Sequence, residues 1–191
     1  KPPSLLDQMR RLGIMLEKDI DLVTRSIYLI TDISSDSAET IIKGLDFFES
    51  VSDELITIHI STYGGDPYMG FAIYDSIRKC KCPIRTVISG ACMSAGVLIA
   101  AGGDKGRRFA DPNTQWMYHS GSEGFDGEAN NFIATAEHTK NFKEICVDAI
   151  KSRSKKSRRF WKKMEDSGSD TYFSSNEALK WGIIDQITEA Y

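Results

Sequence analysis

The chain has 191 residues, of which 41% are hydrophobic and 27% are charged, a composition typical of one ordinary domain with a buried core. It argues against a disordered chain, and a net charge of −3 gives no electrostatic reason to expect nucleic acid as the main partner. No hydrophobic segment reaches the roughly 18 residues of a membrane span, so no contact with a membrane is expected. We therefore expect a single domain over residues 1–191.

Cysteine usage favours a reducing compartment. The chain has four cysteines, which are too few and too unevenly spaced for a disulfide framework and too poor in neighbouring histidines for a zinc site. They are Cys80, Cys82, Cys92 and Cys146. The sequence thus predicts no metal and no cofactor. It favours the cytoplasm, or an organelle stroma or matrix if a targeting segment precedes Lys1.

The predicted elements alternate between strands and helices along the chain. Residues 1–20 are charged and amphipathic, which is typical of an arm or a short helix. Runs of β-branched and apolar residues predict strands at 26–34, 54–62, 84–90 and 114–120. Apolar side chains at helical spacing predict helices at 37–50, 67–80 and 95–103. Strands that alternate with helices at this spacing favour an α/β fold with a largely parallel sheet.

The remainder of the chain is predicted to be mostly helical. Residues 127–153 have the length and period of one long helix. Ser174 and Glu177 have the spacing of a capping box, which predicts a further helix before a last short strand. The run KSRSKKSRR at 151–159 is strongly basic, but it lacks interleaved aromatic residues. It is better explained as a solvated helix end than as a nucleic-acid site.

Ser94 lies in the stretch GACMSAG, between the third predicted strand and the helix that follows it. Active groups of α/β proteins gather at such junctions, where the unpaired N–H groups of a helix start can bind an oxyanion. A serine at a helix start is, however, usually a simple N-cap, so this position alone does not define a nucleophile. The pair Gly64 and Gly65 ends another strand and is either a second source of N–H donors or an ordinary turn.

A serine nucleophile needs a base, and the chain has three histidines. His59 is flanked by strand isoleucines and is predicted at a surface or interface, whereas His138 lies in a charged helix and is expected to be solvated. His119 closes the fourth predicted strand, at the end of the sheet where a catalytic base belongs. The acid that would orient this base stays open among three loop or helix-end carboxylates. They are Asp111, Asp126 and Asp166.

Four blocks of sequence carry a family resemblance. In chain order they contain a Gly-Gly loop with its helix, the serine turn, the lead-in to His119 and the closing helix. They read GGDPYMGFAIYDSI, SGACMSAG, GDKGRRFADPNTQWMYHS and YFSSNEALKWGIID. From about residue 20 to the end, the chain resembles the proteolytic subunit of the Clp protease (ClpP) family. Four ordered blocks at matching spacing are far more specific than any one of them.

The resemblance implies a serine peptidase. The family's nucleophile falls on Ser94 and its base on His119, and counting back from TYFSSNEA puts its acid on Asp166. The backbone N–H groups of Gly65 and Ala95 would be the oxyanion donors. The implied reaction is acyl transfer, in which unfolded polypeptides or short peptides are cleaved through an acyl-enzyme.

The resemblance also implies a fold and an assembly. The fold would be ClpP/crotonase-like, with repeated ββα-type units, a mostly parallel sheet and a protruding handle at about 120–150. Members of the family form homo-oligomers, with heptameric rings stacked in pairs around the sites, and work with an AAA+ unfoldase in ATP-dependent degradation. Because His119 leads directly into the handle, ring contact and triad geometry would be coupled.

The chain departs from the family pattern at several positions. Tyr63 stands where proline is usual before the glycine pair. Met93 and Ala95 flank the serine where alanine and methionine are usual, which predicts an altered pocket shape. The aromatic positions of the family's unfoldase-docking pocket are here Thr57, His59 and Lys79. These departures predict weak or non-standard unfoldase docking and suggest a divergent paralogue or a virus-encoded member.

Three other functions stay open. A different serine peptidase on the related fold would use a Ser–Lys dyad, although His119 and Asp166 at matching positions count against it. A crotonase-like acyl-CoA enzyme would hold a thioester enolate with paired backbone N–H groups and needs no serine triad. A non-catalytic ring subunit would keep the architecture for assembly alone.

Overall fold

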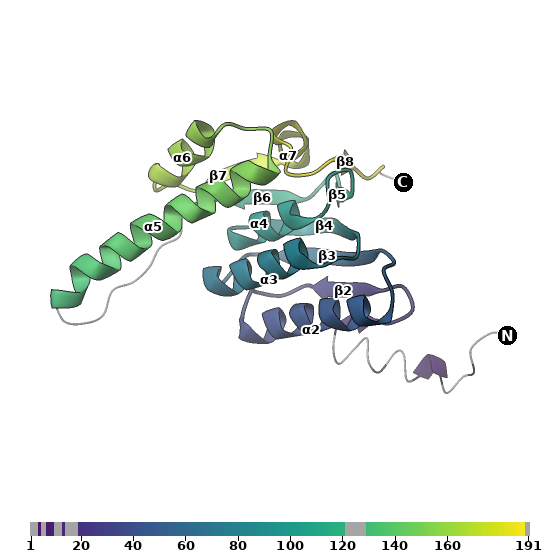
Figure 1. The fold of residues 1–191 in the computed structure, drawn as a ribbon. Coiled ribbons are helices and arrows are strands. Elements are labelled where there is room, and N and C mark those ends of the chain that lie inside the picture. Colours follow the sequence, from purple (N-terminus) through teal and green to yellow (C-terminus); the bar gives the residue numbers. More distant parts are fainter. Residues whose placement is uncertain (1–3, 5–6, 10–12, 14–18, 121–128, 190–191) are drawn as a thin grey trace.

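The computed structural model of this chain describes residues 4, 7–9, 13, 19–120 and 129–189. Most of the predicted arm at 1–20 lies outside the described residues, as does the part of the predicted handle that contains Asp126. Within the described part, an eight-stranded sheet carries a layer of helices on one face (Figure 1). The predicted α/β class with a mostly parallel sheet is confirmed.

The sheet is built around two long central strands, β3 and β4. Its strands are β1 (Ile20–Asp21), β2 (Ser26–Leu29), β3 (Ile56–Thr62), β4 (Ile84–Met93), β5 (Arg108–Ala110), β6 (Gln115–Tyr118), β7 (Thr171–Ser174) and β8 (Gln186–Ile187). The order is β1-β2-β3-β4-β5-β8, and β6 pairs with the second half of β4. The β1–β2 and β6–β7 pairs are antiparallel, and the other pairs are parallel.

Side-chain caps fix where several helices begin. The helices are α2 (Ser35–Val51), α3 (Pro67–Lys79), α4 (Ala95–Gly102), α5 (Ala129–Arg153), α6 (Arg158–Asp166) and α7 (Ser175–Trp181). Asp66 accepts hydrogen bonds from the Tyr68 and Met69 N–H groups at the start of α3. The predicted capping box of Ser174 and Glu177 is present at the start of α7, which ends at the left-handed Gly182.

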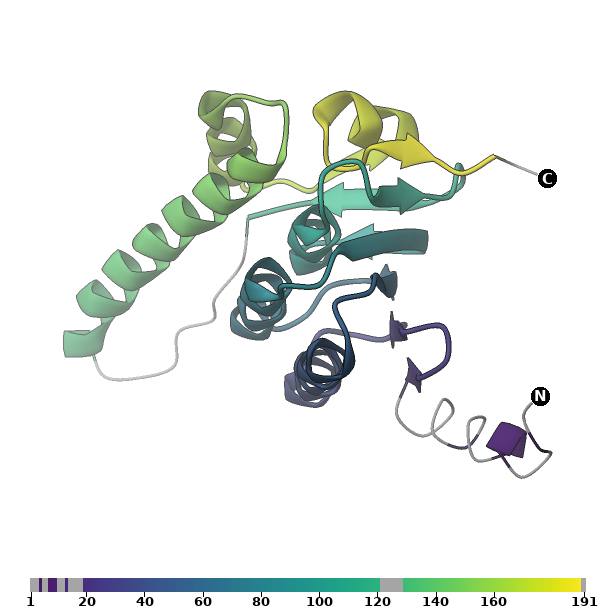
Figure 2. The same ribbon diagram turned by 45° about the vertical axis from the view of Figure 1, so that its right-hand side comes forward.

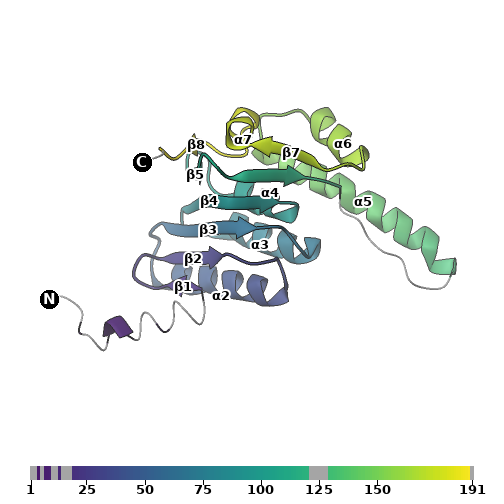
Figure 3. The ribbon, with the colours of Figure 1, turned by 180° about the vertical axis from the view of Figure 1, so that it is seen from behind.

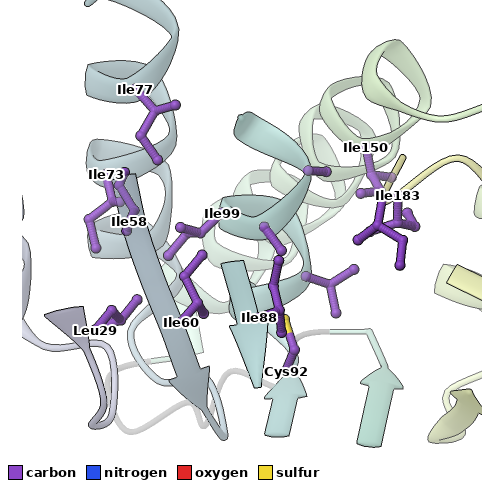
Figure 4. Close-up of a cluster of buried hydrophobic side chains, with 14 of the residues drawn as sticks. Leu29, Ile58, Ile60, Ile73, Ile77, Ile88, Cys92, Ile99, Ile150 and Ile183 are labelled. Atoms are coloured by element: carbon purple, nitrogen blue, oxygen red, sulfur yellow. The ribbon is translucent and has the colours of Figure 1, made fainter. Parts of the chain in front are cut away.

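The hydrophobic core lies between the sheet and the helix layer. Seen from behind, β2, β3 and β4 lie in front of α2, α3 and α4 (Figure 3). Strand side chains alternate, so one set points into the core while the other stays on the opposite face. Figure 4 shows the strand side chains Leu29, Ile58 and Ile60 meeting Ile73 of α3 and Ile99 of α4. This packing holds the carboxyl ends of β3 and β4 side by side.

Helix α5 extends beyond the edge of the sheet (Figures 1 and 2). The sequence predicted this helix at 127–153, close to its observed bounds. Tyr68 of α3 contacts α5, because its hydroxyl lies 2.9 Å from His138 Nε2 and its ring packs on Phe142. None of the helices in the described ranges is long and apolar enough to cross a membrane.

The short elements are where the structure differs from the sequence prediction. Of the strands, β1, β5 and β7 were not predicted, because two to four residues are too few to show alternation. The helix α6 was not predicted as a separate element, and its first two residues fall in the basic run at 151–159 that was read as a solvated helix end. It instead buries Trp161, Met164 and Glu165 against the body of the protein. Of these missed elements, β7 pairs with β6, the strand that His119 follows.

Candidate active site

Ser94 occupies the turn between β4 and α4 in a strained conformation. Its φ of 54° and ψ of −127° fall where side chains other than glycine are rarely found, at a cost of about 1–3 kcal/mol. Although it sits at the N-cap position of α4, its side chain makes no capping hydrogen bond. The Ser94 Oγ instead lies 2.8 Å from Nε2 of His119. The simple capping role that the sequence favoured for this position is therefore wrong.

Backbone contacts hold Ser94 in this position. Its N–H donates to the Met117 carbonyl at 2.9 Å, which continues the parallel pairing of β4 with β6. On the other side lies Gly64, where an added Cβ would stand 2.6 Å from the Cβ of Ser94. With a φ of +104°, this residue also has a conformation that only glycine adopts readily. The loop after β3 can approach the serine this closely because Gly64 has no side chain.

His119 follows β6 directly and contacts a second group through its other ring nitrogen. Its Nδ1 lies 3.5 Å from Oδ1 of Asp170. The antiparallel register of β6 and β7 pairs Tyr118 with Thr171, so the residues just beyond this pair, His119 and Asp170, face each other. The His119 and Asp170 side chains are 30% and 50% exposed. The imidazole thus lies between a hydroxyl and a carboxylate.

Asp166, which the resemblance gave as the acid, does not take this position. It is the last residue of α6, its side chain is 56% exposed, and its Oδ1 lies 3.0 Å from Nζ of Lys162. Of the other two candidates, Asp111 accepts a hydrogen bond from Thr188 Oγ1, and Asp126 lies outside the described residues. Sequence reasoning missed Asp170. The signal that could have found it is antiparallel pairing of TYFS with QWMY. This pairing puts Asp170, which precedes TYFS, opposite His119, which follows QWMY.

The two predicted oxyanion donors lie on either side of this turn. Ala95 is the first residue of α4, where helix N–H groups have no intrahelical partner. Gly65 has a φ of +142°, and an added Cβ would stand 2.2 Å from the Ile33 carbonyl oxygen. Hydrogen bonds from Ile33 N–H to Gly64 O and from Asp66 N–H to Ile33 O hold this loop against residue 33. Both N–H groups are thus carried by backbone segments fixed next to Ser94.

The other two histidines lie elsewhere. The His59 ring stacks on Tyr28 of β2 with 4.8 Å between centroids. Burial, together with the charge of Arg85, lowers the pKa of His59. His138 contacts Tyr68 on α5, as described above. Of the three histidines, His119 is the one that the structure brings to Ser94.

A cavity of about 90 Å³ opens beside the serine and the histidine. Ser94, Ala95 and His119 form part of its lining. Most of the remaining wall is apolar, and it includes Phe71, Leu98, Phe142 and Ile150. Two polar side chains of the wall, Tyr118 and Glu165, are hydrogen-bonded to each other. The cavity is large enough to accept an amino-acid side chain next to the hydroxyl of Ser94.

These features define a class: mixed α/β proteins that carry a serine–histidine pair beyond the carboxyl ends of parallel strands. The model of the Clp protease family matches residues 18–191. The ATP-dependent Clp protease proteolytic subunit of Deinococcus radiodurans is 34% identical over 169 residues, which cover 88% of this chain and 82% of that protein. A solved structure of a ClpP1 mutant from Listeria monocytogenes is 30% identical, with a TM-score of 0.80, and the match covers 88% of this chain and 93% of that one.

The chain belongs to the Clp protease family, as a relative of its proteolytic subunit. The resemblance drawn from the four sequence blocks is thereby confirmed, as is the ClpP-like fold. Family membership supports a peptidase activity.

Proposed function

We propose that the chain is a serine endopeptidase that cleaves unfolded polypeptides or short peptides, with Ser94 as nucleophile, His119 as base and Asp170 as the orienting acid. The observation that carries this proposal is the 2.8 Å contact between Ser94 Oγ and His119 Nε2. Ser94 is at the N-cap position of α4, yet its side chain makes no capping hydrogen bond. This geometry supports proton transfer from the Ser94 hydroxyl to the imidazole rather than a role in stabilising the helix.

Acylation uses Nε2 of His119 as the base. The Ser94 oxygen attacks the carbonyl carbon of the scissile peptide bond while its proton passes to His119 Nε2. The carbonyl oxygen becomes an oxyanion, and the N–H groups of Gly65 and Ala95 are its proposed donors. The C–N bond then breaks, and the imidazolium gives its proton to the leaving amine. The products of this step are a free amine and an ester on Ser94.

Deacylation repeats the sequence with water as nucleophile. Water attacks the ester, His119 accepts a proton from it and returns a proton to Ser94, and a free carboxyl product leaves. The carboxylate of Asp170 favours the tautomer that carries hydrogen on Nδ1 and stabilises the imidazolium. Its 3.5 Å contact is longer than a strong hydrogen bond, and such contacts often tighten only when substrate binds.

The assembly proposed for this function is a homo-oligomer of heptameric rings stacked in pairs, with α5 at the contact between rings. Two apolar side chains on α5, Ile133 and Ile145, are 69% and 54% exposed, and a partner surface would cover them. Because the segment that joins His119 to α5 is short, contact between rings would act on the His119–Asp170 geometry. Native mass spectrometry of the intact protein, with peptidase assays of separated rings, tests this. Active isolated single rings would contradict the coupling.

An AAA+ unfoldase is the proposed partner for ATP-dependent degradation, with weak or non-standard docking. Of the three docking positions, Thr57 is only 8% exposed and His59 stacks on Tyr28. Lys79 adds a charge where an aromatic ring would be expected. Strong stimulation of degradation by a typical ClpP-dependent unfoldase would refute this part. The cytoplasm, or an organelle matrix, stays the predicted location.

Labelling with a fluorophosphonate tests the central proposal, because this probe reacts with activated serines. The intact protein should be labelled on Ser94, and Ser94→Ala should abolish both labelling and peptide hydrolysis. Ser89→Ala is the matched control, since Ser89 is an exposed serine five residues earlier, in the strand β4 that leads to Ser94. An assembled parent protein that is not labelled would instead support an acyl-CoA enzyme or a non-catalytic ring subunit.

A further inference from the structure

A substrate cleaved at Ser94 would place the side chain nearest the cut bond beside this serine, where the cavity lies. The substrate carbonyl must lie within reach of Ser94 Oγ, so the side chain on the same residue, called P1, has to enter a space that borders this oxygen. Among the described residues, the cavity lined by Ser94 and His119 is such a space. Its apolar walls come from α3, α4 and α5. They are formed by Pro67, Phe71, Leu98, Phe142, Cys146 and Ile150.

A buried carboxylate forms part of this wall. Glu165 of α6 is only 3% exposed and lines the cavity. Its Oε2 accepts a hydrogen bond of 2.7 Å from the hydroxyl of Tyr118, which is 7% exposed and also lines the cavity. No partner for the other oxygen, Oε1, is found within the described ranges of the chain. A carboxylate this deeply buried is unfavourable unless a donor or a cation approaches it.

Lys143 also lines the cavity, but it does not neutralise this group. No ion pair between Lys143 and Glu165 is present among the residues that the structure describes. Lys143 is only partly buried, and the long stem of a lysine lets its ammonium group turn toward water. Glu165 is short, buried and held by Tyr118. The group fixed at the cavity wall is therefore the carboxyl of Glu165.

We propose that Glu165 makes this cavity a subsite for a basic P1 side chain, so that the chain cleaves after lysine or arginine; this rests on the proposed peptidase function. The methylene stem of such a residue packs between Phe71, Leu98 and Phe142, and its terminal N–H groups donate to Glu165. Neutral apolar side chains fill the same walls and leave the carboxylate without a partner. Acidic P1 side chains are repelled.

The test measures hydrolysis by the full assembled protein of three fluorogenic peptides that differ only at P1, with lysine, norleucine or glutamate. The parent should have a kcat/KM for the lysine peptide at least about tenfold above that for norleucine, since hydrogen bonds to charged groups contribute that much. Glu165→Gln has nearly the same shape and still accepts from Tyr118, and it should lower this ratio about tenfold. Asp148→Asn removes a carboxylate from the exposed face of α5 and should leave the ratio unchanged.

Each outcome decides the inference. A parent that cleaves the norleucine peptide as well as the lysine peptide overturns it, whether or not Glu165→Gln folds. An unchanged ratio in Glu165→Gln also overturns it, and a preference for glutamate would assign selectivity to Lys143 instead. In these cases fluorophosphonate labelling of Ser94 would show that the peptidase function still stands. A parent protein that shows neither labelling nor any peptide hydrolysis would overturn both this inference and the proposed peptidase function.

Discussion

Asp170 faces His119 across the ends of two antiparallel strands, with 3.5 Å between Asp170 Oδ1 and His119 Nδ1. The pairing of Tyr118 with Thr171 determines this, since His119 directly follows Tyr118 and Asp170 directly precedes Thr171. The position of the carboxylate is thus set by strand register rather than by the helix that ends at Asp166. This relationship separates two carboxylates that lie only four residues apart.

Replacement of each of these two carboxylates by an amide should have very different effects. Asp170→Asn should lower kcat/KM by roughly 10²–10⁴, because an amide favours the wrong imidazole tautomer and cannot stabilise the imidazolium. Asp166→Asn should change it less than about twofold, since it removes only an exposed ion pair with Lys162. Steady-state kinetics on one peptide substrate measures both. The reverse order of effects would return the acid to Asp166.

Gly64→Ala should inactivate the protein. The new Cβ would stand 2.6 Å from the Cβ of Ser94, so either the serine or the glycine loop has to move. Gly106→Ala is the matched control, because Gly106 also has a positive φ, of +85°, but an added Cβ meets nothing within 4 Å. Both variants should lose about 1–2 kcal/mol of stability from the unfavourable φ. Only Gly64→Ala should also lose peptidase activity and fluorophosphonate labelling, and full activity in it would contradict the described turn.

The ion pair of Arg108 and Asp185 should make stability depend on acidity. The Arg108 side chain is 3% exposed, and its guanidinium donates to both oxygens of Asp185 at 2.8 and 2.6 Å. Burial acts to raise the pKa of Asp185, but the hydrogen bonds and charge of Arg108 outweigh it, and the pKa lies below its ordinary value of 3.8. The carboxylate therefore stabilises the fold above about pH 4, and this is lost as the pH falls through the lowered pKa.

Asp185→Asn should accordingly lower the free energy of unfolding by about 3 kcal/mol at neutral pH, since it leaves a buried guanidinium without its partner. The difference from the parent should shrink below pH 4, where the parent loses its own charge. Urea unfolding at several pH values measures it. Glu39→Gln, which breaks an exposed pair with Lys43, should cost at most about 0.5 kcal/mol at any pH. An Asp185→Asn deficit that persists at low pH would mean that the pair is not responsible.

The long elements of this fold could be predicted because their patterns repeat enough to be recognised. The isoleucines of β3 alternate at positions 56, 58 and 60, and α2 and α3 each show apolar side chains at helical spacing. Ser94 and His119 could be selected because they end strands. The same reasoning could not find Asp170, because its position depends on pairing between segments more than fifty residues apart along the chain.

The burial of the carboxylate in the cavity wall could also not be predicted from the sequence. Glu165 lies in RRFWKKMED, a stretch whose charges are typical of a solvated helix. Its burial follows from how α6 packs, with the Trp161 ring against Tyr118 and Trp181. Such packing is a property of the assembled fold, and the local pattern of charges indicates the opposite.

The hydrogen bond from Ser94 N–H to the Met117 carbonyl links the serine to the strand that also carries His119. This bond uses main-chain atoms only, so it does not require particular side chains at positions 93, 95 and 117. Side chains around Ser94 can therefore differ without removing this bond. The unusual order of Met93 and Ala95 therefore leaves this main-chain link between the two strands in place.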